Sequence, residues 1–417
     1  MKVLLVHPGK QHSFETAKAL KDAGVFYKYV TTVYDKDNSL TNRIKKFLKG
    51  KNLKKANTRK CPYLSDNDVI QIYEWWGLLI LFLSRFSFLS KIYFRLNLEL
   101  SNYFADKVAR LAVKENVDAI IVYDGISRKG LEYIKKTAPH IKTIMDVSIS
   151  MRPFMKVNFE YDMNTHHHNG FYKEEAYLWN MKYETVIRNE LRFVDHFFVP
   201  SNVVFESLMF CGIEKNKVSI VPYGVDPDKF SYRQKHVKNN EPLKLIYVGQ
   251  ISYRKGLHHL LKIVQEYNES EVKISLAGAY NEDNELYQQY KSALNIEFLG
   301  FVTRDVLAEA YQNSDVFILP SLGEGLAMVI LEALSTGTPV LVSNFTGGND
   351  VVENFKNGLV YNGLSEDNLR SSISWFLTHK EAIPEMSKNA RESVLNYTWT
   401  KYHKKYAEEL IKFLNKQ

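Results

Sequence analysis

The 417-residue sequence has few cysteines, few prolines and no long uninterrupted apolar run. Its two cysteines, Cys61 and Cys211, have no CxxC partner and no metal-ligand spacing, which excludes a disulfide scaffold and predicts free thiols in a reducing compartment. With 11 prolines, 45% hydrophobic and 24% charged residues, the composition also excludes a disordered or collagen-like chain. A chain of this length predicts two globular domains.

No segment has the features of an export signal or a membrane-spanning helix. Only four apolar residues, Val3–Val6, precede His7, whereas a signal sequence needs about 7–15, so we predict a buried first strand. The most apolar stretch, residues 75–94, is interrupted by two basic residues and three serines. We interpret it as an amphipathic helix, because a spanning helix needs about 20 predominantly apolar residues. We therefore expect a cytoplasmic protein.

Positive charge is concentrated in the first half of the chain. Residues 1–200 hold 32 Lys and Arg against 21 Asp and Glu, whereas the remainder holds 23 against 26, and residues 43–60 alone hold nine basic side chains. Such an excess indicates an anionic partner or a solvated, solubilising face. Beside the aromatic-rich residues 75–94, it favours an anionic membrane surface. Nucleic acid is a rival partner that no recognised motif supports.

Short apolar runs alternate with helical patterns through both halves. This alternation predicts an α/β fold, with doubly wound parallel sheets covered by helices on both faces. The predicted strands are residues 2–7, 119–123, 143–146, 196–200, 244–248, 273–277, 296–298, 316–320 and 339–343. The predicted helices are residues 14–22, 102–115, 175–193, 257–267, 305–312, 327–335 and 367–378.

A polar stretch, residues 227–242, separates the two halves. We place the domain boundary there, with a first domain over residues 1–226 and a second over 227–395. Residues 396–417 contain a polar helix that either packs on the second domain or crosses back to the first. Two such domains facing each other form a cleft at the carboxyl ends of both sheets, where open α/β folds bind their ligands. We expect the active site in this cleft.

The segment after predicted strand 316–320 carries two glutamates. A helix is predicted to open near Gly325, and free amide groups at a helix start can bind a phosphate or a sugar hydroxyl. Glu324 precedes this helix and Glu332 follows eight residues later, so we predict that both point toward the same mouth of the cleft. Each glutamate could instead be structural, Glu324 as a helix cap.

A similar strand, loop and helix start occupies residues 248–257, now with adjacent cations. Arg254 and Lys255 at a helix N-terminus are electrostatically unfavourable unless an anion lies there. A diphosphate would neutralise both side chains. The alternative is a pair that faces solvent.

Together these segments resemble the family 4 glycosyltransferases, which are retaining, nucleotide-sugar-dependent enzymes of the GT-B fold. The resemblance covers most of residues 196–375. It rests, in the family's order, on His196-Phe-Phe-Val-Pro-Ser201, Val221-Pro-Tyr-Gly-Val-Asp226, Arg254-Lys-Gly256, Leu276-Ala-Gly278, Gly300-Phe-Val302, Asp315-Val-Phe-Ile-Leu-Pro-Ser321, Glu324 with Glu332, Gly337-Thr-Pro-Val340 and Gly358. It implies two Rossmann-like domains facing across a cleft, with the donor on the second.

The resemblance also implies roles for individual residues. Glu332 is similar to the glutamate that hydrogen-bonds the donor ribose, and Glu324 to the one that contacts and orients the transferred sugar. Arg254 and Lys255 resemble the catalytic cations that stabilise the departing diphosphate. The further donor-binding positions are the backbone of Gly325, Leu326 and Ala327, and the base-pocket walls Phe301 and Val302.

Three positions depart from the family pattern. Gln250 stands where an arginine is common, so Arg254 is expected to substitute for it. Asp146 matches a position that often holds a sugar-contacting histidine. The usual Gly-Gly loop after the first strand is replaced by residues 7–12, where Gly9 can still let a phosphate approach the backbone. Lys10 and His12 complete the cleft residues predicted for the first domain.

Three consecutive histidines, residues 166–168, raise the question of a metal. Consecutive side chains cannot all turn to one ion, and no Asp/Cys pair stands at zinc spacing nearby, so we predict no metal site there. The resemblance likewise implies no cofactor and no metal requirement, because the cations and the helix dipole take that role. His140 and His196 are interpreted as core or surface histidines, and the same interpretation is the alternative to a cleft role for His12.

The sequence thus predicts a retaining transferase that moves a sugar from a nucleoside diphosphate sugar to an acceptor hydroxyl. The expected acceptor is a glycan or lipid-linked intermediate of surface polysaccharide or glycoconjugate assembly, reached from the inner face of the cell membrane. The alternatives are a sugar-nucleotide epimerase or phosphorylase on the same fold, or a non-catalytic protein that binds a nucleotide or glycan.

Overall fold

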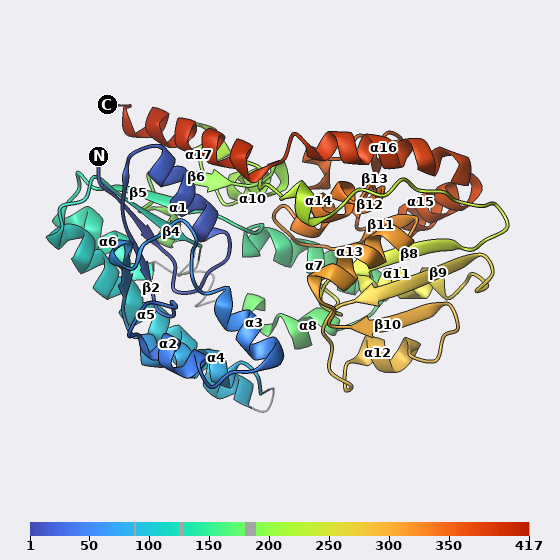
Figure 1. Ribbon diagram of the computed structural model, residues 1–417, viewed down its shortest axis with the longest axis horizontal. Helices are drawn as coiled ribbons and strands as arrows, with labels where there is room; N and C mark the ends of the chain where they lie inside the picture. The colour runs from blue at the N-terminus through green and yellow to red at the C-terminus, as the bar shows by residue number, and fades with distance from the viewer. Residues whose placement is uncertain (87–88, 125–127, 180–188, 417) are drawn as a thin grey trace.

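The computed structural model describes residues 1–86, 89–124, 128–179 and 189–416, which form two α/β domains side by side (Figure 1). A seven-stranded sheet lies in the first domain and a six-stranded sheet in the second. Every strand pair in both sheets is parallel. This arrangement confirms the predicted α/β fold with two doubly wound, Rossmann-like domains.

The first sheet has the strand order β3-β2-β1-β4-β5-β6-β7. Its strands are β1 (Val3–Val6), β2 (Phe26–Thr31), β3 (Val69–Gln71), β4 (Ala119–Tyr123), β5 (Lys142–Asp146), β6 (His196–Val199) and β7 (Val218–Ile220). The helices are α1 (Ser13–Asp22), α2 (Leu40–Lys45), α3 (Gly50–Asn57), α4 (Glu74–Leu83), α5 (Ser90–Lys114), α6 (Arg128–Thr137), α7 (Arg152–His166), α8 (Gly170–Glu174) and α10 (Asn202–Phe210). β1 and β4 are buried throughout, because helices cover both faces of the sheet.

The second sheet repeats this scheme with the order β10-β9-β8-β11-β12-β13. Its strands are β8 (Leu243–Val248), β9 (Val272–Ala277), β10 (Ile296–Gly300), β11 (Val316–Leu319), β12 (Val340–Ser343) and β13 (Gly358–Tyr361). The helices are α11 (Leu257–Val264), α12 (Glu285–Tyr290), α13 (Arg304–Asn313), α14 (Met328–Ser335), α15 (Glu366–Thr378) and α16 (Ile383–Val394). The strand order reverses between β8 and β11, and a ligand site of this fold forms at such a switch point.

Some elements differ from the sequence prediction. Residues 75–94 do not form one helix: α4 ends at Leu83, where the Ser84 hydroxyl donates back to the Leu81 carbonyl oxygen at 3.0 Å, and α5 begins at Ser90. The predicted helix 175–193 is also wrong at its start, because residues 176–179 form a 3₁₀ turn; residues 87–88 and 180–188 lie outside the described residues. Among the described residues, no helix is long and apolar enough to cross a membrane.

The C-terminal helix α17 (Trp399–Leu414) crosses back to the first domain (Figure 1). Tyr402 lies 3.0 Å from the Thr16 hydroxyl of α1, and His403 lies 2.9 Å from Glu15. Tyr406 stacks on Phe198 of β6 with 4.2 Å between the ring centroids. The sequence left open whether this helix packs on the second domain or crosses back to the first, and the structure shows that it crosses back. The end of the chain therefore connects the two domains.

The domains also meet directly at the carboxyl ends of their sheets. The backbone amide and hydroxyl of Ser150, after β5, both donate to the Glu324 carbonyl oxygen, at 3.1 and 2.8 Å. The Ser201 hydroxyl, after β6, donates to the Gly325 carbonyl oxygen at 3.0 Å. The loop after β11 is therefore held to the first domain through its own backbone carbonyl oxygens.

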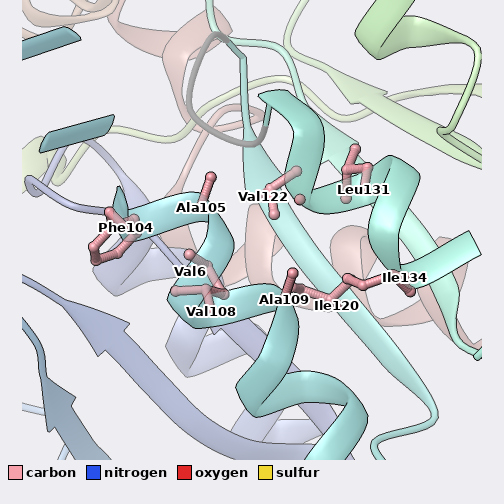
Figure 2. A pocket seen from close by; sticks show the side chains of 10 residues that line it. Val6, Phe104, Ala105, Val108, Ala109, Ile120, Val122, Leu131 and Ile134 are labelled. Atoms are coloured by element: carbon pink, nitrogen blue, oxygen red, sulfur yellow. The ribbon is translucent and has the colours of Figure 1, made fainter. Parts of the chain in front are cut away.

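A small internal cavity lies within the first domain, between β1, β4, α5 and α6 (Figure 2). Its volume is about 10 Å³, roughly that of a single water-sized sphere. Apolar side chains line it, among them Val6, Phe104 and Ile134. A space of this size without polar partners is a gap in core packing rather than a ligand site.

Candidate active site

The loop between β8 and α11 carries the two predicted cations. Gly256, which precedes α11, has a left-handed backbone (φ +70°), and a β-carbon there would lie 1.9 Å from the Pro320 carbonyl oxygen. This close approach needs glycine and sets the loop against the end of β11. Arg254 is further fixed through its carbonyl oxygen, which accepts from the Leu322 amide at 2.9 Å and the Ser321 hydroxyl at 3.1 Å.

The loop between β11 and α14 brings Glu324 to these cations. Its Oε1 lies 2.6 Å from Lys255 Nζ and 2.9 Å from Arg254 Nη1, and it accepts from the Ser321 hydroxyl at 2.8 Å. The Glu324 side chain is only 12% exposed. Burial alone would raise the pKa of Glu324, but the charges of Lys255 and Arg254 outweigh it and lower the pKa, so the group stays ionised.

A residue of the first domain completes this charge cluster. Glu175 Oε1 lies 3.1 Å from Arg254 Nε, while Arg254 Nη1 also donates to the Gly323 carbonyl oxygen at 2.8 Å. Two carboxylates therefore balance two cations across the domain interface. Glu175 was not predicted from the sequence, because nothing in a helix expected to start at that residue indicates a partner 79 positions away along the chain.

Glu332 lies on α14 and is half-buried. Burial raises its pKa, although the Arg304 charge and a hydrogen bond with Tyr311 oppose that rise. Arg304 starts α13 and was not predicted from the sequence. Glu332 therefore has a different charged neighbour, Arg304, from the Lys255 and Arg254 that face Glu324.

The backbone groups predicted to hold the donor are not equivalent. Ala327, the residue before α14, already donates its amide to the Thr346 carbonyl oxygen at 3.1 Å. For Gly325, a β-carbon would lie 2.0 Å from the Ser148 carbonyl oxygen, so only glycine fits against the first domain there. Leu326 is buried beside it. The loop between β11 and α14 is therefore in contact with the first domain at Gly325 and with the second domain at Ala327.

The other donor-side positions lie at the exposed edge of the second domain. Phe301 is 55% exposed, and Lys55 Nζ of α3 lies 5.4 Å from its ring centroid. Val302 is half-buried. Gln250 is exposed, and its carbonyl oxygen accepts from the Tyr247 hydroxyl at 2.7 Å. The basic segment of the first domain thus reaches the predicted base pocket, which the sequence did not indicate.

The predicted residues of the first domain are tied to its own core. His12 Nε2 lies 3.1 Å from Asp146 Oδ1, and both side chains are buried. The amide of Gly9 donates to His7 Nδ1 at 2.8 Å, and the Gly9 carbonyl oxygen accepts from Tyr29 at 3.2 Å. Lys10 is half-buried, and burial together with the nearby Arg59 lowers its pKa.

Two doubly wound domains, with a charged site at the switch point of the second, define the GT-B class of proteins. Residues 228–393 match the family model described as Glycosyl transferases group 1. This match covers the second domain, and it confirms the family resemblance found in the sequence and the presence of a glycosyltransferase domain.

Two curated glycosyltransferases are similar to about half of this chain. The sulfoquinovosyl transferase SQD2 of Arabidopsis thaliana is 29% identical over 227 residues, which cover 52% of this chain and 44% of the relative. The UDP-Gal:alpha-D-GlcNAc-diphosphoundecaprenol alpha-1,3-galactosyltransferase of Escherichia coli is 28% identical over 201 residues, which cover 44% and 51%. The chain thus spans about half the length of the curated relatives it matches.

Solved structures share the whole architecture. Sucrose-phosphate synthase from Thermosynechococcus elongatus superposes with a TM-score of 0.67 at 16% identity, covering 99% of both chains. Anabaena Alr3699/HepE in complex with UDP and glucose gives a TM-score of 0.61 at 16% identity, again over 99% of both chains. At this identity the likeness shows the fold alone, and it includes the first domain, which the family model does not reach.

Proposed function

We propose that this protein is a retaining glycosyltransferase that moves a sugar from a nucleoside diphosphate sugar to an acceptor hydroxyl. The observation that carries the proposal is the buried Glu324 carboxylate held between Arg254 and Lys255 at the β8–β11 switch point. The two neighbouring loops shield these groups from water. The carboxylate can contact the sugar, and the two cations can stabilise the negative charge of a leaving diphosphate. The UDP and glucose bound to the structural neighbour Alr3699/HepE support a donor of this chemical class.

In this mechanism the cations act on the leaving group. As the bond between the sugar and the diphosphate breaks, negative charge grows on the phosphate oxygens, and Arg254 and Lys255 stabilise it. Glu324 orients the sugar and Glu332 holds the ribose. The acceptor hydroxyl attacks from the face that the diphosphate leaves and gives its proton to the departing phosphate oxygen, so the anomeric configuration is retained. With two cations in this role, we expect no metal requirement for transfer.

The test is product analysis with single nucleotide sugars. UDP-, GDP-, ADP- and dTDP-sugars are incubated with the protein, first alone and then with glycan acceptors, and products are identified by chromatography and NMR. The proposal expects release of the nucleoside diphosphate with a sugar joined to the acceptor in the retained configuration. Conversion of a donor to its epimer without acceptor, or binding without release or transfer, would contradict it.

We further propose that the acceptor is lipid-linked and that the first domain docks on an anionic membrane from the cytoplasmic side, in surface polysaccharide or glycoconjugate assembly. The support is an apolar surface beside basic helices: Trp75 is 62% exposed and Phe82 54% exposed on α4, and Phe47 is 85% exposed just after α2. Basic residues beside such a face suit anionic headgroups. The diphosphoundecaprenol acceptor named for the E. coli relative belongs to the same chemical class.

Within the basic segment, not every charge is available for a membrane. Lys45 pairs with Asp35 at 2.5 Å, and Lys60 lies 3.7 Å from both Asp37 and Asp66. Lys46, Lys49 and Lys54 are exposed, and no ion pair of theirs is found among the described residues. These three lysines are therefore the ones to change.

The docking test is cosedimentation with anionic and neutral vesicles at low and high salt. Wild type should bind anionic vesicles, and binding should weaken with salt because charges are screened over about 8–10 Å at physiological ionic strength. Changing Lys46, Lys49 and Lys54 to Gln should remove this binding. The matched control changes three lysines of α17, Lys401, Lys404 and Lys412, to Gln. Equal binding by the two triple variants would contradict membrane docking through this surface.

A further inference from the structure

Histidines from both domains converge on one buried carboxylate. Asp162 of α7 is fully buried, and its two oxygens face His258 and His259 at the start of α11. His259 Nε2 lies 2.6 Å from Asp162 Oδ1, and His258 Nε2 lies 2.9 Å from Asp162 Oδ2. The three ligand atoms lie within 4.8 Å of one another.

These spacings are close to those of a metal site. With metal–ligand bonds of about 2.0–2.1 Å, tetrahedral ligand atoms stand about 3.3 Å apart. The two Asp162–histidine separations would therefore open by less than about 1 Å to admit an ion. Two imidazole nitrogens and one carboxylate oxygen are a donor set typical of zinc and other divalent transition metals.

A second carboxylate orients His259 and His166 as metal ligands are usually oriented, whereas His258 Nδ1 is buried without a hydrogen-bond partner among the described residues. Glu366, the first residue of α15, has its Oε1 2.8 Å from His259 Nδ1 and 3.3 Å from His166 Nδ1. A carboxylate that accepts from Nδ1 holds the proton there and leaves Nε2 free to bind a metal. Lys262 Nζ in turn lies 2.8 Å from Glu366 Oε2 and fixes that carboxylate.

Two of the three consecutive histidines flank this cluster. His166 Nε2 is buried, has no hydrogen-bond partner among the described residues, and lies 3.9 Å from Asp162 Oδ1. His168 accepts the Gly170 amide at Nδ1 (3.2 Å), so its Nε2–H donates to Asp162 Oδ2 at 2.8 Å. His167 has a left-handed backbone and is exposed. The residues at zinc spacing that the sequence lacked are supplied by α11, about 90 positions further along the chain.

We propose that Asp162, His258 and His259 bind a divalent transition-metal ion of the zinc class, with His166 placed for a fourth position. The ion joins α7 of the first domain to α11, which follows the Arg254–Lys255 loop directly. Its role is structural, because every protein ligand is buried or nearly so and none belongs to the charge cluster around Glu324. The site stands on its own geometry and does not depend on the proposed transferase activity.

The experiment measures metal content of the full chain without a histidine tag. After chelator treatment, the protein is dialysed against Zn²⁺ and then against buffer, and retained zinc is measured by mass spectrometry; Co²⁺ substitution gives a visible absorption spectrum. Wild type should retain one Zn²⁺ per chain. Asp162→Asn and His258→Gln should lose it, and Glu366→Gln, which changes only the orienting carboxylate, should weaken binding about 10–100-fold.

His140→Gln is the matched control, because His140 is exposed and pairs only with Asn116 among the described residues. It should keep wild-type zinc content. His258→Gln decides the question if Asp162→Asn fails to fold, since His258 is at the domain interface rather than in a core. No retained zinc in wild type would mean that the cluster is a hydrogen-bonded network only, and equal zinc in His258→Gln and His140→Gln would equally overturn the proposal.

Discussion

The two domains share one fold but differ in how their charged residues are used. In the second domain, Arg254, Lys255 and Glu324 meet in two neighbouring loops at the switch point of the sheet. In the first domain, His12 of the loop after β1 and Asp146 at the end of β5 pair with each other, and both side chains are buried. We therefore expect substitutions in the second-domain cluster to affect donor chemistry more than substitutions of His12 and Asp146.

The largest effect is expected from the charge cluster itself. Glu324→Gln keeps the size of the side chain but removes the charge that Arg254 and Lys255 face. We expect turnover to fall about 100–1,000-fold, the usual cost of losing one preorganised electrostatic contact in a transition state. Single-turnover donor cleavage measures it. Glu353→Gln, which changes an exposed glutamate paired only with Lys356 at 2.8 Å among the described residues, is the control; equal rates would refute the assignment.

The next effect concerns the contact between the domains. Gly325→Ala places a β-carbon 2.0 Å from the Ser148 carbonyl oxygen, so the two domains must shift apart locally. We expect a loss of about 1–3 kcal/mol in the free energy of unfolding, as for other overpacked sites, together with reduced turnover. Gly9→Ala is the comparison, since its nearest contact is 3.2 Å, to the His7 ring. Equal losses in the free energy of unfolding for the two variants would show that the close approach at Gly325 does not determine stability.

A smaller effect is expected from Asp146, and it tests whether this residue stabilises the first domain or contacts the substrate. Asp146→Asn removes a buried charged hydrogen-bond partner of His12, at a cost of about 1–3 kcal/mol of stability. Donor affinity should stay unchanged, because the pair belongs to the core. Chemical denaturation and calorimetric titration of the donor measure the two quantities. A variant of wild-type stability that has lost turnover would instead make Asp146 a functional substitute for the histidine common in the family.

The sequence predicted the second domain far better than the first. Its strand–loop–helix units are local, so Arg254, Glu324 and their glycines could be placed from spacing alone. The first domain's contributions depend on contacts between distant segments: Glu175 reaches Arg254, Lys55 reaches Phe301, and Asp162 reaches His258. Linear spacing carries no signal for such pairs.

Elements with weak patterns were also missed for physical reasons. The first three residues of β2 are only half-buried, so Phe26–Thr31 lacks the continuous apolar run that marked β1 and β4. The end of α4 depends on a serine that bonds back to its own helix, which composition alone does not reveal. In contrast, Cys61 and Cys211 are not joined in a disulfide, as predicted.

The central claim is that the second domain holds a nucleoside diphosphate through Arg254 and Lys255. Calorimetric titration of wild type and Lys255→Met with UDP, GDP, ADP and dTDP, and with the matching nucleosides, tests it most directly. We predict that one diphosphate binds wild type more tightly than its nucleoside does. Lys255→Met should weaken that diphosphate about 10–100-fold, the value of a charged hydrogen bond, and leave the nucleoside unchanged. No binding of any diphosphate, or equal losses for diphosphate and nucleoside, would contradict the account.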